Sequence, residues 1–190
     1  MQLEFESARL TFRPLKVSDG SDLQHTYCDP RVMRYVYPAL TPEQLEQRMP
    51  SFTRRGVGGA LGVWRAARKD TDRFVGDGIL LPLAIETDDT QWELLDGGVD
   101  MPSGDIEVGY ILRADAWGRG YGTEICKTLI DFGFQHLPIS EIVAVTDPDN
   151  ATSMHVLAKS GLRHCGMRRA YASEATDFRI NRAAWEARGT

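Results

Sequence analysis

The sequence predicts an α/β or α+β fold, in which helices pack around one β-sheet. Two observations lead to this prediction. Apolar runs of strand type recur along the 190 residues, and segments with helical periodicity lie between them. In the second half of the chain, a strand, a glycine-rich loop, a helix, a further strand and a further helix follow one another. A chain of this length suits one domain, so we expect a single domain over residues 1–190.

The first third of the chain is expected to hold one strand followed by helices. Residues 9–13 alternate between polar and apolar side chains and stop at a proline, which is typical of a half-buried strand. Ser18 and Asp19 can cap a short helix. Thr41 precedes a proline and stands three residues before Gln44, a pattern that predicts the start of another helix.

The middle third has the pattern of strands. Apolar runs at residues 60–67 and 74–85 are separated by a polar turn, and residues 91–104 contain the Gly and Pro typical of a long loop. Residues 105–113 form the next predicted strand. Its alternation gives two faces, with Glu107, Gly109 and Ile111 on one and Val108, Tyr110 and Leu112 on the other.

The last third alternates helices and strands. A helix with Ile125 and Leu129 at helical spacing follows the glycine-rich loop, and residues 141–146 form a strand. Asn150 can cap a helix over residues 151–159. Further strands are predicted at residues 162–167 and 177–181.

Composition and charge exclude several classes of protein. Hydrophobic residues make up 42% of the chain and charged residues 26%, which argues against disorder. The 22 Lys and Arg against 27 Asp and Glu argue against nucleic acid or an anionic membrane as the main partner, and fit a cationic substrate. The chain lacks an apolar run of about 18 residues. Residues 1–6 lack the basic start of a signal peptide, so we expect a cytoplasmic protein.

The glycine-rich loop indicates an anion site. Gly118, Gly120 and Gly122 alternate just before a helix, where free backbone N–H groups and the positive end of the helix favour negative charge. Arg119 adds a cation. The spacing matches neither a Walker A loop nor G-x-G-x-x-G, which indicates a phosphate-bearing ligand of another kind. The alternative is a turn whose glycines only allow close packing of the helix.

Cysteine and histidine give no sign of a metal site or a disulfide framework. The three cysteines are odd in number and far apart, which is typical of reduced thiols. The four histidines lack the spacing of metal ligands, so no metal is expected. The residues concerned are Cys28, Cys126, Cys165, His25, His136, His155 and His164.

Four stretches of the chain carry a resemblance to a known family. They are ARLTFRP at residues 8–14, EVGYIL at 107–112, WGRGYGTE at 117–124 and NATSMHVLAKSGL at 150–162. With them the chain resembles the GNAT superfamily of N-acetyltransferases, and within it the group of ribosomal-protein N-terminal (alanine) acetyltransferases. The resemblance implies a mixed, mostly antiparallel sheet with splayed central strands, helices on both faces, and a cofactor core at about residues 105–167.

The resemblance also implies where acetyl-coenzyme A binds. Its pantetheine arm would lie between the splayed strands along the backbone of Ile111, Leu112 and Arg113. Asn150 and Ser153 would lie near the thioester, although Asn150 can equally be no more than a helix cap. The pyrophosphate would be held by the loop residues Gly118, Arg119, Gly120, Tyr121, Gly122 and Thr123.

Acetyl transfer to an amine needs a base for the amine and a proton for the leaving thiolate. Glu107 is the candidate base, and its alternative is an ordinary carboxylate paired with an arginine. Ser153 is the candidate proton donor, because many relatives have a tyrosine seven positions after the capping Asn, where this chain has Leu157. The expected walls of the amine pocket are Tyr35, Trp64 and Trp92, although core packing explains Tyr35 and Trp64 equally well.

The resulting hypothesis is an acetyl-coenzyme A dependent N-acetyltransferase. It would acetylate a primary amine, either a protein N-terminus or a small molecule, by direct attack in a ternary complex. The alternative is a catalytically silent protein that binds acetyl-coenzyme A, which the apolar Leu157 favours. A homodimer is a further expectation, since pairing through C-terminal strands is common among similar proteins.

Overall fold

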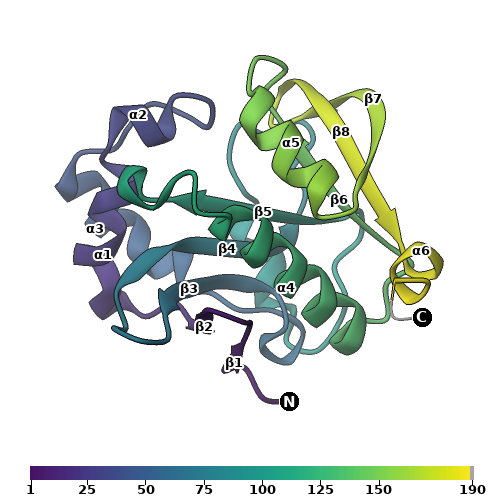
Figure 1. Ribbon diagram of the computed structural model, residues 1–190, viewed down its shortest axis with the longest axis horizontal. Coiled ribbons are helices and arrows are strands. Elements are labelled where there is room, and N and C mark those ends of the chain that lie inside the picture. Colours follow the sequence, from purple (N-terminus) through teal and green to yellow (C-terminus); the bar gives the residue numbers. More distant parts are fainter. Residues whose placement is uncertain (189–190) are drawn as a thin grey trace.

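The computed structural model describes residues 1–188 and shows one mixed sheet with helices on both faces (Figure 1). The sheet has eight strands in the order β1-β2-β3-β4-β5-β6-β8-β7. The strands are β1 Phe5–Glu6, β2 Leu10–Pro14, β3 Gly62–Arg68, β4 Phe74–Pro82, β5 Ile106–Leu112, β6 Glu141–Thr146, β7 Arg163–Ala170 and β8 Ser173–Asn181.

The centre of the sheet is splayed. All neighbouring strands pair antiparallel except β5 and β6, which are parallel and pair at a single position, Glu107 with Val143. On its other side, β5 pairs with β4 along its whole length, from Ile106 to Leu112. The strands β5 and β6 therefore diverge after Glu107 and open a gap. The predicted fold, a mostly antiparallel mixed sheet with splayed central strands, is confirmed.

Each face of the sheet carries its own set of helices. One face packs against α1 (Gly20–Tyr27), α2 (Pro30–Met33) and α3 (Pro42–Phe52). The other packs against α4 (Tyr121–His136) and α5 (Ala151–Lys159). The remaining short helices are Val17–Asp19, Val57–Gly59, Trp92–Gly97, Ala114–Ala116 and α6 (Arg182–Glu186).

The two faces of β5 agree with the predicted alternation. Ile111 packs in the cluster beneath α1–α3, whereas Val108, Tyr110 and Leu112 pack in the cluster beneath α4 and α5. Because β5 borders the gap, side chains from both of its faces can reach that gap.

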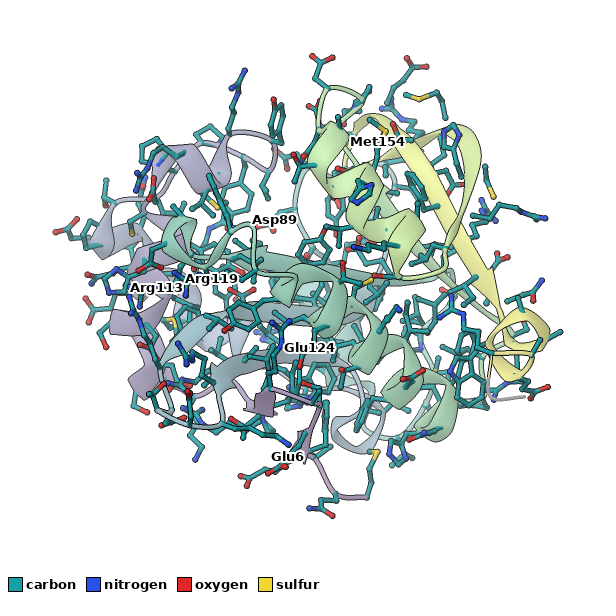
Figure 2. All side chains as sticks on the ribbon, in the orientation of Figure 1. Glu6, Asp89, Arg113, Arg119, Glu124 and Met154 are labelled. Carbon is teal, nitrogen blue, oxygen red and sulfur yellow. The ribbon has the colours of Figure 1, made fainter. Side chains whose placement is uncertain are left out.

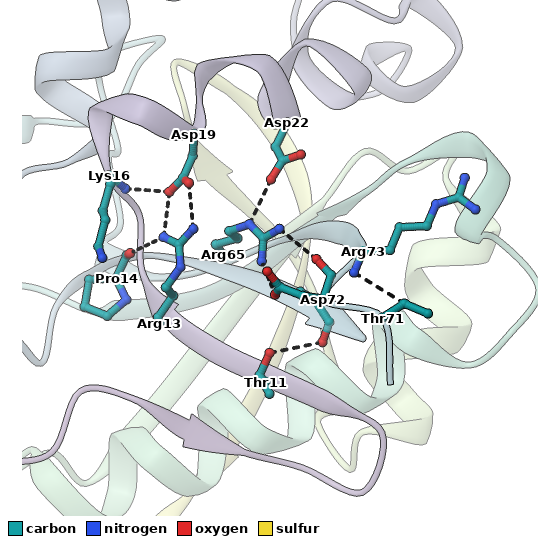
Figure 3. Close-up of polar contacts among 11 residues, drawn as sticks. Thr11, Arg13, Pro14, Lys16, Asp19, Asp22, Arg65, Thr71, Asp72 and Arg73 are labelled. Carbon is teal, nitrogen blue, oxygen red and sulfur yellow. Dashed lines mark hydrogen bonds and ion pairs between the residues drawn. The ribbon is translucent and has the colours of Figure 1, made fainter. Parts of the chain in front are cut away.

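Capping follows the sequence in α3 and departs from it in α1. In α3, the Gln44 N–H donates to Thr41 Oγ1 at 3.2 Å and the Thr41 N–H donates to Gln44 Oε1 at 2.8 Å. Asp19 stands at the start of α1 but does not cap it. Its carboxylate instead accepts two hydrogen bonds from the Arg13 guanidinium of β2, at 2.6 and 2.7 Å, and one from the Lys16 N–H (Figure 3). The carboxylate that the sequence predicts as the cap of α1 therefore binds the Arg13 guanidinium instead.

A second ion pair ties α1 to the sheet. Arg65 of β3 is 7% exposed, and its guanidinium contacts Asp22 of α1 at 2.8 Å and Asp72 of the β3–β4 turn at 3.0 Å (Figure 3). A buried guanidinium needs such partners because losing water without a counter-charge is costly. The pairs fix α1–α3 over the face of the sheet that bears Glu107.

Several predicted boundaries shift. The strand expected over 74–85 ends at Pro82, and the loop 91–104 contains the turn of helix Trp92–Gly97. The strands expected at 162–167 and 177–181 are longer and form one hairpin, β7–β8, whose turn holds Tyr171 and Ala172 at positive φ. No helix among residues 1–188 has both the length and the apolar composition needed to cross a membrane.

Candidate active site

A cavity of about 320 Å³ lies where β5 and β6 diverge. Its walls come from α1, α3 and the segment 35–37 after α2, together with the segment before β5, the first turn of α5 and the turn between β7 and β8. Asp89, one of its lining residues, is labelled in Figure 2 in the opening between α2 and α5. Segments from both ends of the chain thus meet at the gap in the sheet.

Glu107 is a buried carboxylate in this cavity. It is 4% exposed, and burial raises its pKa to about 8, an effect that the charge of Arg168 partly offsets. Arg168 itself forms ion pairs with Asp105 at 2.9 Å and Asp177 at 3.6 Å. No ion pair to Glu107 is found in the described part of the chain, so it is not an arginine-paired surface carboxylate.

Tyr171 contacts Glu107 from the tip of the β7–β8 hairpin. The Tyr171 hydroxyl donates a hydrogen bond to Glu107 Oε1. The turn is anchored beside it, since the Tyr171 N–H donates to the Ala84 carbonyl and the Ala172 N–H to the Ile85 carbonyl, both at 2.9 Å. The sequence contains no local signal for Tyr171, because only the position of the hairpin in the fold brings together residues 64 positions apart.

The first turn of α5 forms the opposite wall. Asn150 Oδ1 accepts a hydrogen bond from the Ser153 N–H at 3.0 Å, so Asn150 caps the helix as expected. Ser153 Oγ lies 3.3 Å from the hydroxyl oxygen of Tyr110. Leu157, one turn further on, is 2% exposed and lines the cavity without a polar group.

Tyr110 therefore brings a phenol to the region where Leu157 lacks one. It is half-buried on β5, and burial raises its pKa above the ordinary value for tyrosine. It stays protonated at neutral pH and can donate a proton. From the sequence, Tyr110 is only a residue on one face of a strand, because its proximity to Ser153 depends on how α5 packs on β5.

The glycine loop contains two kinds of glycine. Gly118 and Gly120 have φ of 71° and 79°, in the left-handed region that favours glycine, and both are exposed. Gly122 is buried, and a Cβ there would lie 3.1 Å from the Tyr110 ring. The first two shape the exposed loop before α4, whereas Gly122 allows close packing of α4 on β5.

Two arginines labelled in Figure 2 accompany the loop, Arg119 within it and Arg113 before it. Arg119 is exposed, and its carbonyl accepts a hydrogen bond from Arg9 at 2.9 Å. Arg113 follows β5 and forms an ion pair with Asp115 at 3.1 Å. Arg9 also pairs with Glu124 of the first turn of α4 at 2.6 Å, which fixes the loop against the N-terminal segment.

Two of the three aromatic residues expected in the amine pocket line the cavity, namely Tyr35 and Trp92. The prediction for Trp64 is wrong. Trp64 is fully buried on the face of β3 that packs against α4, where its ring lies 5.2 Å from that of Phe132. Its neighbour Val63 points to the other face and lines the cavity, because successive strand residues alternate.

The charges on the cavity wall all have one sign. Six lining residues are acidic, and no Lys, Arg or His is found among the described residues that line it. They are Asp77, Asp88, Asp89, Glu107, Asp147 and Glu174. Across residues 1–188, no group of three or more His, Cys, Asp and Glu side chains is arranged to hold a metal ion.

Comparison with known proteins gives the family. Residues 9–163 match the acetyltransferase (GNAT) domain, and the chain belongs to this family. It is 26% identical to the uncharacterized N-acetyltransferase p20 of Bacillus licheniformis, over 86% of this chain and 84% of that protein. The protein is therefore an acyltransferase whose co-substrate is acetyl-coenzyme A.

Solved structures share the fold. An acetyltransferase from Agrobacterium tumefaciens str. C58 superposes with a TM-score of 0.74 at 18% identity, covering 94% of each chain. An aminoglycoside acetyltransferase, AAC(6')-Ib, solved in complex with coenzyme A, superposes with a TM-score of 0.71 at 16% identity, covering 95% of this chain and 99% of that one.

Proposed function

We propose that the chain works as a single domain that transfers the acetyl group of acetyl-coenzyme A to a primary amine by direct attack in a ternary complex. The acceptor is a protein N-terminus, as in the ribosomal-protein acetyltransferases that the sequence resembles, or a small amine. One observation carries the proposal. The gap between β5 and β6 opens into a cavity with the Glu107 carboxylate on one side and the Tyr110–Ser153 pair on the other.

The chain offers acetyl-coenzyme A a fitting site. The edge of β5 beyond Glu107 has no partner strand on the β6 side, so the backbone of Ile111, Leu112 and Arg113 can pair with the pantetheine arm. The exposed residues 118–120 lead into the N-terminus of α4, where N–H groups can stabilise a pyrophosphate. The exposed side chain of Arg119 can add a charge-assisted contact.

Glu107 is suited to take a proton from the attacking amine. A base works best when its pKa lies near the working pH, and burial brings that of Glu107 to about 8. An α-amino group, with a pKa of about 8, is partly neutral near neutral pH, whereas an alkylamine with a pKa near 10.4 depends more on this base. The Tyr171 hydrogen bond holds the carboxylate in place.

The Tyr110–Ser153 pair is suited to protonate the departing thiolate. The phenol keeps its proton at neutral pH, and the serine hydroxyl 3.3 Å away can pass it on. This pair stands in for the tyrosine that many relatives carry where this chain has Leu157. A silent binding protein, the second candidate, depends on Leu157 alone and leaves the buried Glu107 without a role.

Release of free thiol separates the two candidates. The protein is incubated with acetyl-coenzyme A and a panel of peptide N-termini, diamines, amino alcohols and aminoglycosides. Thiol release with at least one amine supports transfer. Calorimetric binding of the cofactor together with silence over the whole panel supports the silent alternative.

Replacing Tyr110 with Phe is expected to lower kcat about tenfold to a hundredfold, because the variant keeps the ring and removes the proton donor. The KM for acetyl-coenzyme A is expected to change little. Ser153→Ala should lower kcat to a similar extent. The kcat of the double variant should be no lower than that of the more severely affected single variant. Independent, multiplying effects of the two substitutions would contradict a shared proton path.

Replacing Gly118 with Glu is expected to weaken coenzyme A binding at least tenfold, because a carboxylate enters the loop assigned to the pyrophosphate. Gly166→Glu is the matched control, since both glycines have positive φ and open space at the Cβ position. Calorimetric titration with coenzyme A measures both. Equal affinities in the two variants would refute the pyrophosphate assignment.

A further inference from the structure

The cavity contains a second buried carboxylate, remote from Glu107. Asp77 of β4 is completely buried, and its Oδ1 accepts a hydrogen bond from the Tyr27 hydroxyl of α1 at 3.1 Å. Its other oxygen, Oδ2, has no hydrogen-bond partner in the described part of the chain, and neither has the hydroxyl of Tyr37. Both residues line the cavity. Buried polar atoms are almost always satisfied, so these two call for a partner.

The described residues supply no positive charge that pairs with Asp77. The charged and titratable groups around Tyr27, Tyr37 and Asp77 are Cys28, Arg48 and Asp89. The guanidinium of Arg48 lies 5.6 Å from the centre of the Tyr37 ring and is already paired with Asp89 at 2.6 Å. Burial accordingly raises the pKa of Asp77 to about 7.

The register of the sheet sets the separation between the two carboxylates. Asp77 pairs with Ile111, and Glu107 pairs with Leu81. Both side chains lie on the face beneath α1–α3, and they are four positions apart along the strands. That spacing corresponds to about 13 Å. A molecule with a positive charge at each end, about 10 Å apart, can reach both carboxylates.

We propose that Asp77, Tyr27 and Tyr37 form a subsite for a second cationic group of the acceptor, so that the preferred substrate is a linear diamine or polyamine. The proposal rests on the proposed acetyl transfer and names its acceptor class. The ammonium group donates hydrogen bonds to Asp77 Oδ2 and the Tyr37 oxygen, and its charge replaces the proton that Asp77 otherwise holds. The acidic lining of the cavity attracts such a molecule from water.

A pair of probes of equal length tests the subsite. Acetylation of diaminooctane is compared with that of aminooctanol, which has a hydroxyl in place of one amine. The wild type is expected to acetylate the diamine with a kcat/KM at least tenfold higher. Asp77→Asn should lower the value for the diamine about tenfold or more and leave that for aminooctanol unchanged. Asp88→Asn, an exposed carboxylate on the same wall, is the control and should retain the preference.

Proton release gives an independent measurement on the wild type. Binding of diaminooctane to the protein loaded with coenzyme A is followed by calorimetry at pH 7 in two buffers of different ionisation enthalpy. Because a bound cation lowers the pKa of Asp77 from about 7, up to about half a proton should be released, and aminooctanol should release less. Equal proton release by the two probes, or equal acetylation of them, overturns the subsite. If no amine is acetylated, the proposed function fails, whereas proton release still decides the subsite.

Discussion

Replacing Glu107 with Gln is expected to lower turnover about a hundredfold or more, because the variant keeps the size and polarity of the side chain but cannot accept a proton. In the wild type, kcat/KM should rise with pH and level off above about 8, the pKa to which burial raises the carboxyl group. In the Glu107→Gln variant, kcat/KM should not show this rise with pH. Rates measured between about pH 6 and 10 with a small amine check both expectations.

Two further variants test whether the pH profile reports the ionisation of Glu107. Glu174→Gln removes an exposed carboxylate from the same cavity wall and should leave the profile intact. Tyr171→Phe removes the hydrogen bond that favours the ionised form of Glu107, so the profile should move to higher pH with little loss at its plateau. A Glu107→Gln enzyme with the wild-type profile would contradict the assignment of Glu107 as the base.

The burial of two carboxyl groups, Glu107 and Asp77, is expected to make the fold less stable as the pH rises. In the folded protein the pKa of Glu107 is raised to about 8 from 4.5, and that of Asp77 to about 7 from 3.8. Below about pH 4 both carboxyls are protonated in either state. Between about pH 4 and 8 the unfolded chain releases these protons while the folded one holds them, so the free energy of unfolding falls.

Each of two substitutions, Glu107→Gln and Asp77→Asn, should remove part of this fall in the free energy of unfolding. At pH 9 each variant is expected to be more stable than the wild type by roughly 2–4 kcal/mol, and near pH 4 the difference should be small. Urea denaturation of the unliganded protein at the two pH values measures it. The same difference at both pH values would contradict the raised pKa values and point to a packing effect instead.

Local patterns in the sequence anticipated much of the fold. The predicted strand over residues 141–146 and the predicted helix over 151–159 have the observed bounds, because a short apolar run and the Asn150 cap are local signals. The capping box of Thr41 and Gln44 formed as expected. Asp19 did not cap α1, since an arginine from a neighbouring strand competes more strongly for its carboxylate.

The site was anticipated in part. The spacing of its glycines indicated the loop as an anion site, and the family resemblance pointed to Glu107 and Ser153, which both line one cavity in the structure. Their roles remain predictions. The wrong assignment of Trp64 arose because an aromatic residue in a strand can point to either face, and only the register with β4 decides which.

The sequence by itself determined the fold class and the kind of protein. Helical and strand periodicities predict the fold class, and four local stretches, WGRGYGTE among them, carry the resemblance to the family. Only the tertiary structure decided the surroundings of the buried carboxylates. Tyr171 reaches Glu107 and Tyr27 reaches Asp77 across 64 and 50 residues of chain, through hairpin register and helix packing. Burial, which sets the pKa of both acids, depends on the whole fold rather than on neighbouring residues.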